Sequence, residues 1–478
     1  MNALLALLAL ALAVSISLLI PVEGPAAVLF CICLAALVGF TISRHKSHGQ
    51  FLAQVFAAAL LLRMAIGTLI YMLKLQEFFG GDALTYDIIG EVLLVYWQGH
   101  MTFAEYETAL GAFMTRNWGM SYLVGGIYSI MGRNMLAVQF FSAVVGAATA
   151  PVIFLCARHI FQNLRVARLT ALLIAFFPSL VLWSSQGLKD APIIFLLAVS
   201  MLATLKLGER LSAKYFTILL LALYGLFTLR FYIFYMTAAA VIGAFFIGMR
   251  VQTTRNMARQ FAVVAAMGLA LTYLGVLSKA GEQIETYGDL DAVQRSRSDL
   301  AQSNSGFSQD IDVSSTSGAL SAIPLGLVYL LFAPFPWQLA NLRQSITLPE
   351  MLVWWASFPM LVLGGWFTVK YRLRQALPIL IFTSMLTLAY SIFQGNVGTA
   401  YRQRAQILVF YFMFVAVGVV LMKERRENQR QLRSQKQAEE ATGRRAAPSR
   451  SPVPVAVPAS NVAARGTAPD ALKLRVGG

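Results

Sequence analysis

The stretch that decides the fold is Phe78-Phe79-Gly80-Gly81-Asp82-Ala83-Leu84-Thr85-Tyr86-Asp87, which follows three hydrophobic segments and precedes many more. Gly80 and Gly81 allow the backbone to turn sharply just before Asp82. From Asp87 onward apolar residues recur with a helical period, ending in Tyr96-Trp97. This pattern predicts a short helix along the membrane interface. Asp82 is then either a helix cap or a chemical group at the membrane surface.

The composition identifies a polytopic membrane protein. The 478 residues are 58% hydrophobic and 13% charged, and the mean hydropathy is +0.66. A soluble domain does not need so much apolar surface. The net charge is +16, but the basic residues cluster between hydrophobic segments and in the tail, so they indicate topology rather than nucleic-acid binding. The three cysteines lie in apolar segments and predict neither a disulfide framework nor a zinc site.

The hydrophobic segments predict an all-α transmembrane bundle of about twelve spans, between eleven and thirteen, with both chain ends in the cytoplasm. This orientation places four basic turns inside: Arg44–His48, Arg158–Arg168, Arg250–Arg259 and Lys370–Arg374. The predicted spans cover about 3–20, 23–43, 51–73, 134–157 and 167–185, then a sixth that ends near 205, 214–229, 231–249, a ninth that ends near 277, and finally 350–369, 375–394 and 404–422. Arg63 lies in the middle of the third span and is expected to face a polar interior or a partner.

The chain divides into six regions. These are 1–73, three spans; 74–133, an outer loop with juxtamembrane helices; 134–277, a transmembrane core; 278–349, a polar outer loop and a re-entrant or interfacial segment; 350–422, the last spans; and 423–478, a basic, Pro/Ala-rich tail. The composition of 278–320 favours a mobile loop, with a lid over a site as the alternative. The tail is expected to be disordered, with its basic start against anionic lipid headgroups.

With this topology, one set of charged residues shares the outer face: Asp82, Asp87, Glu91, Lys189, Asp190, Arg230, Arg402 and Arg404. Arginines offer forked donors to a lipid phosphate, and a carboxylate can take the proton of an acceptor hydroxyl. Sugar transfer from a polyprenyl phosphate needs both. Each of these residues could also have a purely structural role. Arg402 and Arg404 would then snorkel to the interface at a helix start, Arg230 would be an interfacial anchor, and Lys189 and Asp190 would pair with each other.

Several ordered pieces within about residues 75–230 resemble the GT-C membrane glycosyltransferases. The matching branch contains protein O-mannosyltransferases, aminoarabinose transferases and lipopolysaccharide core glycosyltransferases. The pieces are Asp82 with Tyr86, Trp118-Gly119 to Gly132, Ala157-Arg158-His159-Ile160-Phe161, and Phe177-Pro178-Ser179 through Ser185 to Lys189-Asp190. Phe335-Pro336-Trp337 and Gly395 to Arg404 are similar to bacterial members that assemble exopolysaccharides. In one departure, Ala83 follows Asp82 where the family commonly has a second acidic residue.

The resemblance implies that Asp82 is the catalytic base and that Asp190 is a second catalytic carboxylate. With the residue chemistry above, it leads us to expect Lys189, Arg230, Arg402 and Arg404 at the donor phosphate, and Tyr86, Asp87 and Tyr401 along the substrate. The expected donor is a polyprenyl-phosphate sugar, and the acceptor is a lipid-linked glycan, a lipid or a protein. No metal or other cofactor is expected, because this branch mostly uses none and the sequence has no compact ligand cluster.

The expected location is the bacterial inner membrane, with the site on the outer face and a role in cell-surface polysaccharide or glycoconjugate assembly. Two alternatives fit the same sequence. An O-antigen-type polymerase or ligase also has many spans and outer-loop arginines, but it would not need the Asp82 loop. A lipid-linked glycan transporter or flippase often shows repeated hydropathy halves, which this sequence does not show. The sequence does not determine the oligomeric state.

Overall fold

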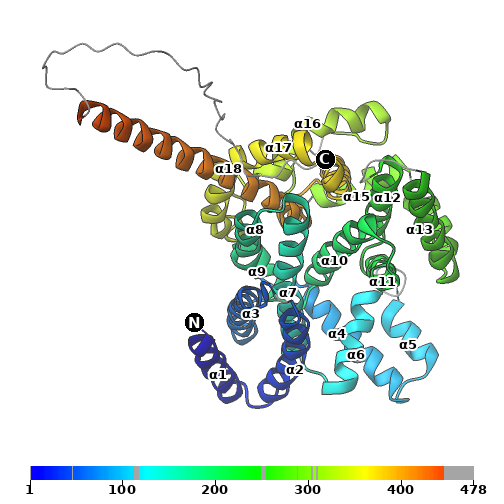
Figure 1. The fold of residues 1–478 in the computed structure, drawn as a ribbon. Helices are drawn as coiled ribbons and strands as arrows, with labels where there is room; N and C mark the ends of the chain where they lie inside the picture. The colour runs from blue at the N-terminus through cyan, green and yellow to red at the C-terminus, as the bar shows by residue number, and fades with distance from the viewer. Residues whose placement is uncertain are drawn as a thin grey trace, which may run out of the picture.

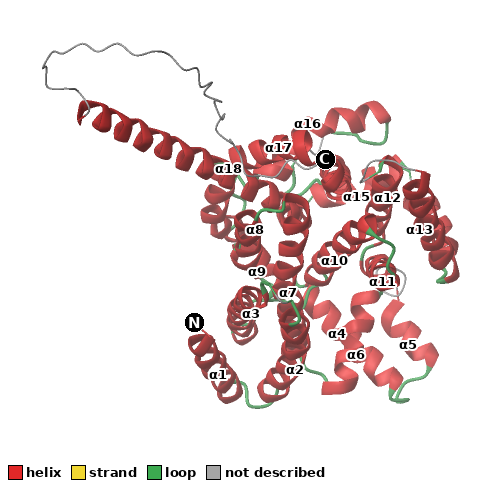
Figure 2. Cartoon of the chain, viewed as in Figure 1, coloured by secondary structure: helices red, strands yellow, loops and turns green. Residues whose placement is uncertain are grey.

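The computed structural model describes residues 2–45, 47–111, 118–248, 254–287, 289–302, 305–307 and 311–445. Within these ranges every regular element is a helix (Figures 1 and 2). The helices are α1 (Asn2–Leu19), α2 (Gly24–Ser43), α3 (Gly49–Met72), α4 (Asp82–Trp97), α5 (Phe103–Leu110), α6 (Gly119–Met131), α7 (Met135–Phe161), α8 (Leu164–Phe176), α9 (Pro178–Ser184), α10 (Asp190–Glu209), α11 (Ala213–Leu229), α12 (Phe231–Ile247), α13 (Thr254–Tyr273), α14 (Val276–Tyr287), α15 (Leu290–Ala301), α16 (Thr316–Phe332), α17 (Leu342–Phe393) and α18 (Val397–Arg445). The predicted all-α class is therefore confirmed.

The number of membrane crossings stays a prediction. Each of the twelve predicted spans falls on a helix, and α17 supplies two of them because its backbone breaks at Arg372. Seven of the described helices are long and apolar enough to cross a membrane, and the bent pair α8 and α9 would add an eighth. The helices α11, α12 and α16 are apolar but shorter, as is the stretch Met257–Tyr273 of α13. These long apolar helices indicate an integral membrane protein.

The core is built around α7, which packs against α3, α8 and α10. The middle of its buried face is rich in small residues, among them Ala143, Gly146, Ala147 and Ala150. Small residues allow helix backbones to approach closely in a membrane bundle. A Cβ atom at Gly146 would lie 2.4 Å from Cβ of Ser184, so this close approach fixes α7 against α9.

A bend between α8 and α9 directs the chain toward the functional site. The two helices meet at 53° because Pro178 interrupts the helical hydrogen bonds. Arg63, which is 1% exposed, donates to the carbonyls of Ala175 (2.7 Å) and Ile174 (3.3 Å) and to the Ser184 hydroxyl (2.7 Å). The intramembrane arginine therefore serves as a cap for a broken helix, and its partner is polar backbone, as its position in the span predicts.

The segment after the polar loop is held in a similar way. α16 contains 17 residues, fewer than the about 20 that a straight span needs. It ends before a cis peptide between Ala333 and Pro334. Arg404 is 1% exposed and donates to the carbonyls of Leu331 (3.0 Å) and Ala333 (3.2 Å). The short helix agrees with a re-entrant or interfacial segment, which stays a prediction.

Two segments differ from the expected disorder. Residues 278–320 contain α14 and α15, and Arg297 fastens α15 to the carbonyls of Ile392 (2.9 Å) and Gln394 (3.0 Å). Residues 423–445 continue α18, which projects from the bundle as a long helix (Figure 1). Glu, Gln, Lys and Arg are good helix formers, which explains the extension. Residues 446–478, Asp310 and Arg250 lie outside the described residues.

Candidate active site

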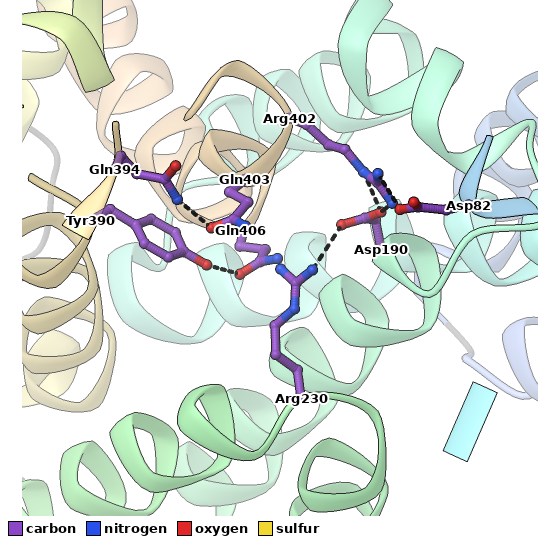
Figure 3. A network of polar contacts seen from close by, with 8 residues as sticks. All are labelled: Asp82, Asp190, Arg230, Tyr390, Gln394, Arg402, Gln403 and Gln406. Carbon is purple, nitrogen blue, oxygen red and sulfur yellow. Dashed lines mark hydrogen bonds and ion pairs between the residues drawn. The ribbon is translucent and has the colours of Figure 1, made fainter. Parts of the chain in front are cut away.

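Arg402 joins the two carboxylates that the sequence singled out (Figure 3). Its Nη1 donates to Oδ2 of Asp82 at 2.6 Å, and its Nε and Nη2 donate to Oδ2 of Asp190 at 2.8 and 2.5 Å. Arg230 approaches the other oxygen of Asp190, with 4.0 Å between Nη2 and Oδ1. Three segments that are far apart in sequence thus meet through one guanidinium.

Breaks in the helical backbone bring these groups together. Asp82 begins α4 directly after Gly80 and Gly81, whose φ values of 127° and 76° lie in the left-handed region that favours glycine. Asp190 begins α10, so both carboxylates lie at helix N-termini, where the helix dipole stabilises negative charge. Arg230 is the single residue between α11 and α12, and Arg402 lies in the second turn of α18.

Apart from Asp190, these charged groups line a cavity of about 860 Å³. Besides Asp82 and Arg402, its wall includes the cations Lys189, Arg230 and Arg343, and the aromatic residues Phe79, Trp183 and Tyr401. The Trp183 ring lies 5.5 Å from Cζ of Arg402, so the guanidinium is held by a cation–π contact as well as by carboxylates. This volume and this mixture of cations and aromatics suit a large anionic ligand.

The two carboxylates differ sharply in exposure. The Asp82 side chain is 45% exposed, whereas the Asp190 side chain is 1% exposed and the Arg402 side chain 16% exposed. Asp190 is buried, its Oδ2 accepts two hydrogen bonds from Arg402, and Arg230 lies 4.0 Å from its Oδ1, so its negative charge helps to hold both arginines in place. The exposed carboxylate remains accessible to a substrate. Asp190 is therefore placed to position Arg402, and Asp82 is the carboxylate of the two that a substrate can reach.

Burial also changes two neighbouring groups. Together with the nearby positive charge of Arg230, burial lowers the pKa of Lys189 to about 8. Lys189 thus changes charge close to physiological pH while facing the cavity. Burial raises the pKa of Tyr86, and the carboxylates of Asp82 and Asp190 add to this effect. Tyr86 therefore stays a neutral phenol beside the carboxylates.

Three predicted site residues have other partners. Asp87 accepts a hydrogen bond from Tyr128 and forms an ion pair with Arg133 at 2.7 Å, so it fastens α4 to α6 and does not line the cavity. Arg404 points to the end of α16 and does not line the cavity either, which contradicts its expected place at the donor phosphate. Tyr401 does line the cavity, but its hydroxyl donates to Glu350 at 2.8 Å.

Trp183 and Arg343 also line the cavity but are not among the residues predicted from the sequence. Trp183 lies inside the Pro178-to-Asp190 stretch that carries the family resemblance, so its sequence position indicates that it is near the site. Arg343 follows the proline-containing segment, lies 5.2 Å from the Phe78 ring and donates to the carbonyl of Glu77 at 3.2 Å. A further polar network beside Arg230 comprises Tyr390, Gln394, Gln403 and Gln406 (Figure 3).

Comparison with known families points the same way as the geometry. Residues 118–276 match the family model described as dolichyl-phosphate-mannose-protein mannosyltransferase. The predicted resemblance to GT-C membrane glycosyltransferases is confirmed. The matched region includes Lys189, Asp190 and Arg230, whereas Asp82 and Arg402 lie outside it. The roles of those two residues therefore depend on the structure of this chain.

The remaining comparisons are more distant. A solved structure of the archaeal oligosaccharyltransferase AglB from Archaeoglobus fulgidus, in complex with an inhibitory peptide and a dolichol-phosphate, is 17% identical, with a TM-score of 0.37. The alignment covers 65% of this chain and 43% of that one, so this chain spans less than half of its length. A search of curated proteins finds no match.

Proposed function

We propose that the protein is an integral membrane glycosyltransferase that moves a sugar from a polyprenyl-phosphate donor to an acceptor hydroxyl. The contact that carries this proposal is the Arg402 bridge between exposed Asp82 and buried Asp190, inside a cavity with Lys189 and Arg230. The similarity of residues 118–276 to a dolichyl-phosphate-mannose-dependent family supports a lipid-phosphate donor. The role is assembly of a cell-surface polysaccharide or glycoconjugate in a bacterial inner membrane.

In the proposed reaction, Asp82 takes the proton of the acceptor hydroxyl as its oxygen attacks the anomeric carbon of the sugar. The bond between that carbon and the phosphate oxygen breaks, and the electron pair leaves with the polyprenyl phosphate. Attack opposite the leaving group inverts the anomeric configuration. The phosphate gains one negative charge, which Lys189, Arg230 and Arg402 stabilise. These protein cations supply the positive charge, so the proposal includes no metal ion.

Donor binding would also release the base. Arg402 holds Asp82 at 2.6 Å. The pair is partly exposed, so it is worth at most about 1 kcal/mol and a phosphate can replace the carboxylate. Arg402 keeps its bonds to Asp190 in this exchange, which fixes the guanidinium against the phosphate. Asp82 is then free to accept a proton only when the donor is in place.

The long helix α18 supports an outer-face site. Arg402 lies near its beginning, and Glu427 pairs with Arg165 at 2.8 Å near its basic end. The 25 residues between them correspond to about 37 Å of helix, more than the roughly 30 Å hydrocarbon core. Because basic segments remain in the cytoplasm, the end with Arg165 is cytoplasmic and the site faces outward.

The test is transfer of labelled sugar in purified, lipid-reconstituted protein, using a panel of synthetic polyprenyl-phosphate sugars. Asp82→Asn should lower turnover by about 10²–10⁴ while donor binding persists, because only the base is lost. Arg402→Ala should weaken donor binding as well. Arg404→Lys is the matched control and should leave donor affinity of the folded protein unchanged, because Arg404 lies outside the cavity. Wild-type turnover by Asp82→Asn would refute the role of Asp82, and lipid translocation without transfer would favour a flippase.

A further inference from the structure

A second, smaller pocket lies away from the charged cavity. Its volume is about 360 Å³, and it is formed by α4, α5, α6 and α14. Its lining consists of Ile89, Leu93, Tyr106, Leu110, Trp118, Ser121, Tyr122 and Lys279. The proposed transfer reaction uses none of these residues. Helices α4, α5 and α6 form a group at one side of the bundle (Figure 1).

The pocket has an apolar floor and an aromatic rim. Leu93 and Tyr106 are 1% and 3% exposed, and Tyr106 is held in place by stacking on Tyr96 with 4.3 Å between ring centroids. At the rim, Trp118 and Tyr122 meet edge to face at 5.1 Å, and Tyr122 is 43% exposed. The rigid floor fixes the shape of the pocket, while the rim rings remain accessible.

Lys279 adds a cation to the aromatic rim. Its Nζ lies 5.9 Å from the centre of the Trp118 ring. It comes from α14, the part of the polar insertion that had no assigned role. An ammonium group offers three donors, and Tyr122 adds a hydroxyl. The pocket therefore combines flat apolar faces with hydrogen-bonding groups at their edges.

We propose that this pocket binds a sugar ring of a glycan acceptor. A pyranose has an apolar C–H face that packs on an aromatic ring and hydroxyls around its edge that need hydrogen-bond partners, which is the combination present here. A peptide acceptor would not need aromatic platforms with donors at their edges. The proposal rests on the proposed glycosyltransferase function and specifies the acceptor as a glycan.

The geometry of α4 connects this pocket to the reaction. Ile89 and Leu93 follow Asp82 by seven and eleven residues, which places all three on one stripe of the helix. At 1.5 Å per residue they lie about 10 and 16 Å from Asp82, a distance of about two or three pyranose rings. An acceptor glycan can therefore lie along α4 with its terminal hydroxyl at Asp82 and an inner ring in the pocket.

The first test is direct binding of hexose and N-acetylhexosamine oligosaccharides, from monosaccharides to hexasaccharides, to reconstituted protein. The wild type should bind at least one series with affinity that rises with chain length. Tyr122→Ala and Lys279→Ala should each weaken that binding, by about tenfold for the loss of the aromatic contact. Tyr273→Ala removes an aromatic side chain that is 93% exposed and lies in neither cavity, so it should bind as the wild type does. Equal binding by all variants, or no saccharide binding, would overturn the proposal.

The second test compares transfer to a monosaccharide acceptor with transfer to a tetrasaccharide acceptor. Tyr122→Ala should raise KM for the longer acceptor and leave the shorter one unchanged, because only the longer acceptor reaches the pocket. Asp82→Asn should bind the tetrasaccharide normally and fail to transfer sugar to it. Absence of transfer by the wild type would refute the proposed function. Transfer that is equally sensitive to Tyr122→Ala for both acceptors would refute only the glycan pocket.

Discussion

The contrast between Asp82 and Asp190 gives the sharpest quantitative prediction. Both carboxylates bind the same arginine, but their side chains are 45% and 1% exposed. Replacing an exposed partner by Asn removes an ion pair worth about 0–1 kcal/mol. Replacing a buried partner leaves its cations without compensation, which typically costs about 3–5 kcal/mol. Asp190→Asn affects two such cations, because Arg230 also lies 4.0 Å from Asp190.

Two measurements on the same preparations test this contrast. The free energy of unfolding, from a sodium dodecyl sulfate titration in mixed micelles, should fall by about 3–5 kcal/mol in Asp190→Asn. In Asp82→Asn it should change by less than about 1 kcal/mol. Turnover should respond differently from stability. Asp82→Asn should lose about 10²–10⁴ in turnover and keep its donor affinity. Asp190→Asn should lose donor affinity, because Arg402 loses its anchor. Equal losses of stability in the two variants would refute the assignment of anchor and base.

Two further predictions follow from the surroundings of the site. Because burial lowers the pKa of Lys189 to about 8, its charge is present below that pH and lost above it, so donor affinity should fall as pH rises through about 8. Lys189→Arg should keep its donor affinity on the alkaline side, and an unchanged pH profile in this variant would argue against Lys189 at the phosphate. Arg63→Met should destabilise the protein by about 1–3 kcal/mol for each carbonyl left unpaired at the bend. It should also weaken donor binding, since the bend positions Lys189 and Asp190; unchanged donor affinity in folded Arg63→Met would disprove that coupling.

The sequence predicts the helices well because the physical signal is local. Hydrophobic length marks each span, and basic turns mark one side of the membrane. It also identifies Asp82, Asp190 and Arg402 as groups on one face. It does not reveal that Arg402 joins the two carboxylates, because that contact depends on how the N-terminal ends of α4, α10 and α18 meet. Nor does it separate Asp87 from Asp82, since the difference lies in the partner Arg133.

The buried arginines show why roles are harder to predict than positions. Arg402 and Arg404 are two residues apart, and on sequence grounds both suit a phosphate. Their side chains leave α18 in different directions, and Arg404 meets the carbonyls that end α16 before Pro334. Arg63 meets those that end α8 before Pro178. A proline break in a membrane helix exposes carbonyls that need a donor, and a nearby arginine supplies it. An intramembrane arginine is therefore a candidate for substrate binding only where it does not donate to the exposed carbonyls of a broken helix. Arg402 meets that condition, because its hydrogen bonds go to the carboxylates of Asp82 and Asp190.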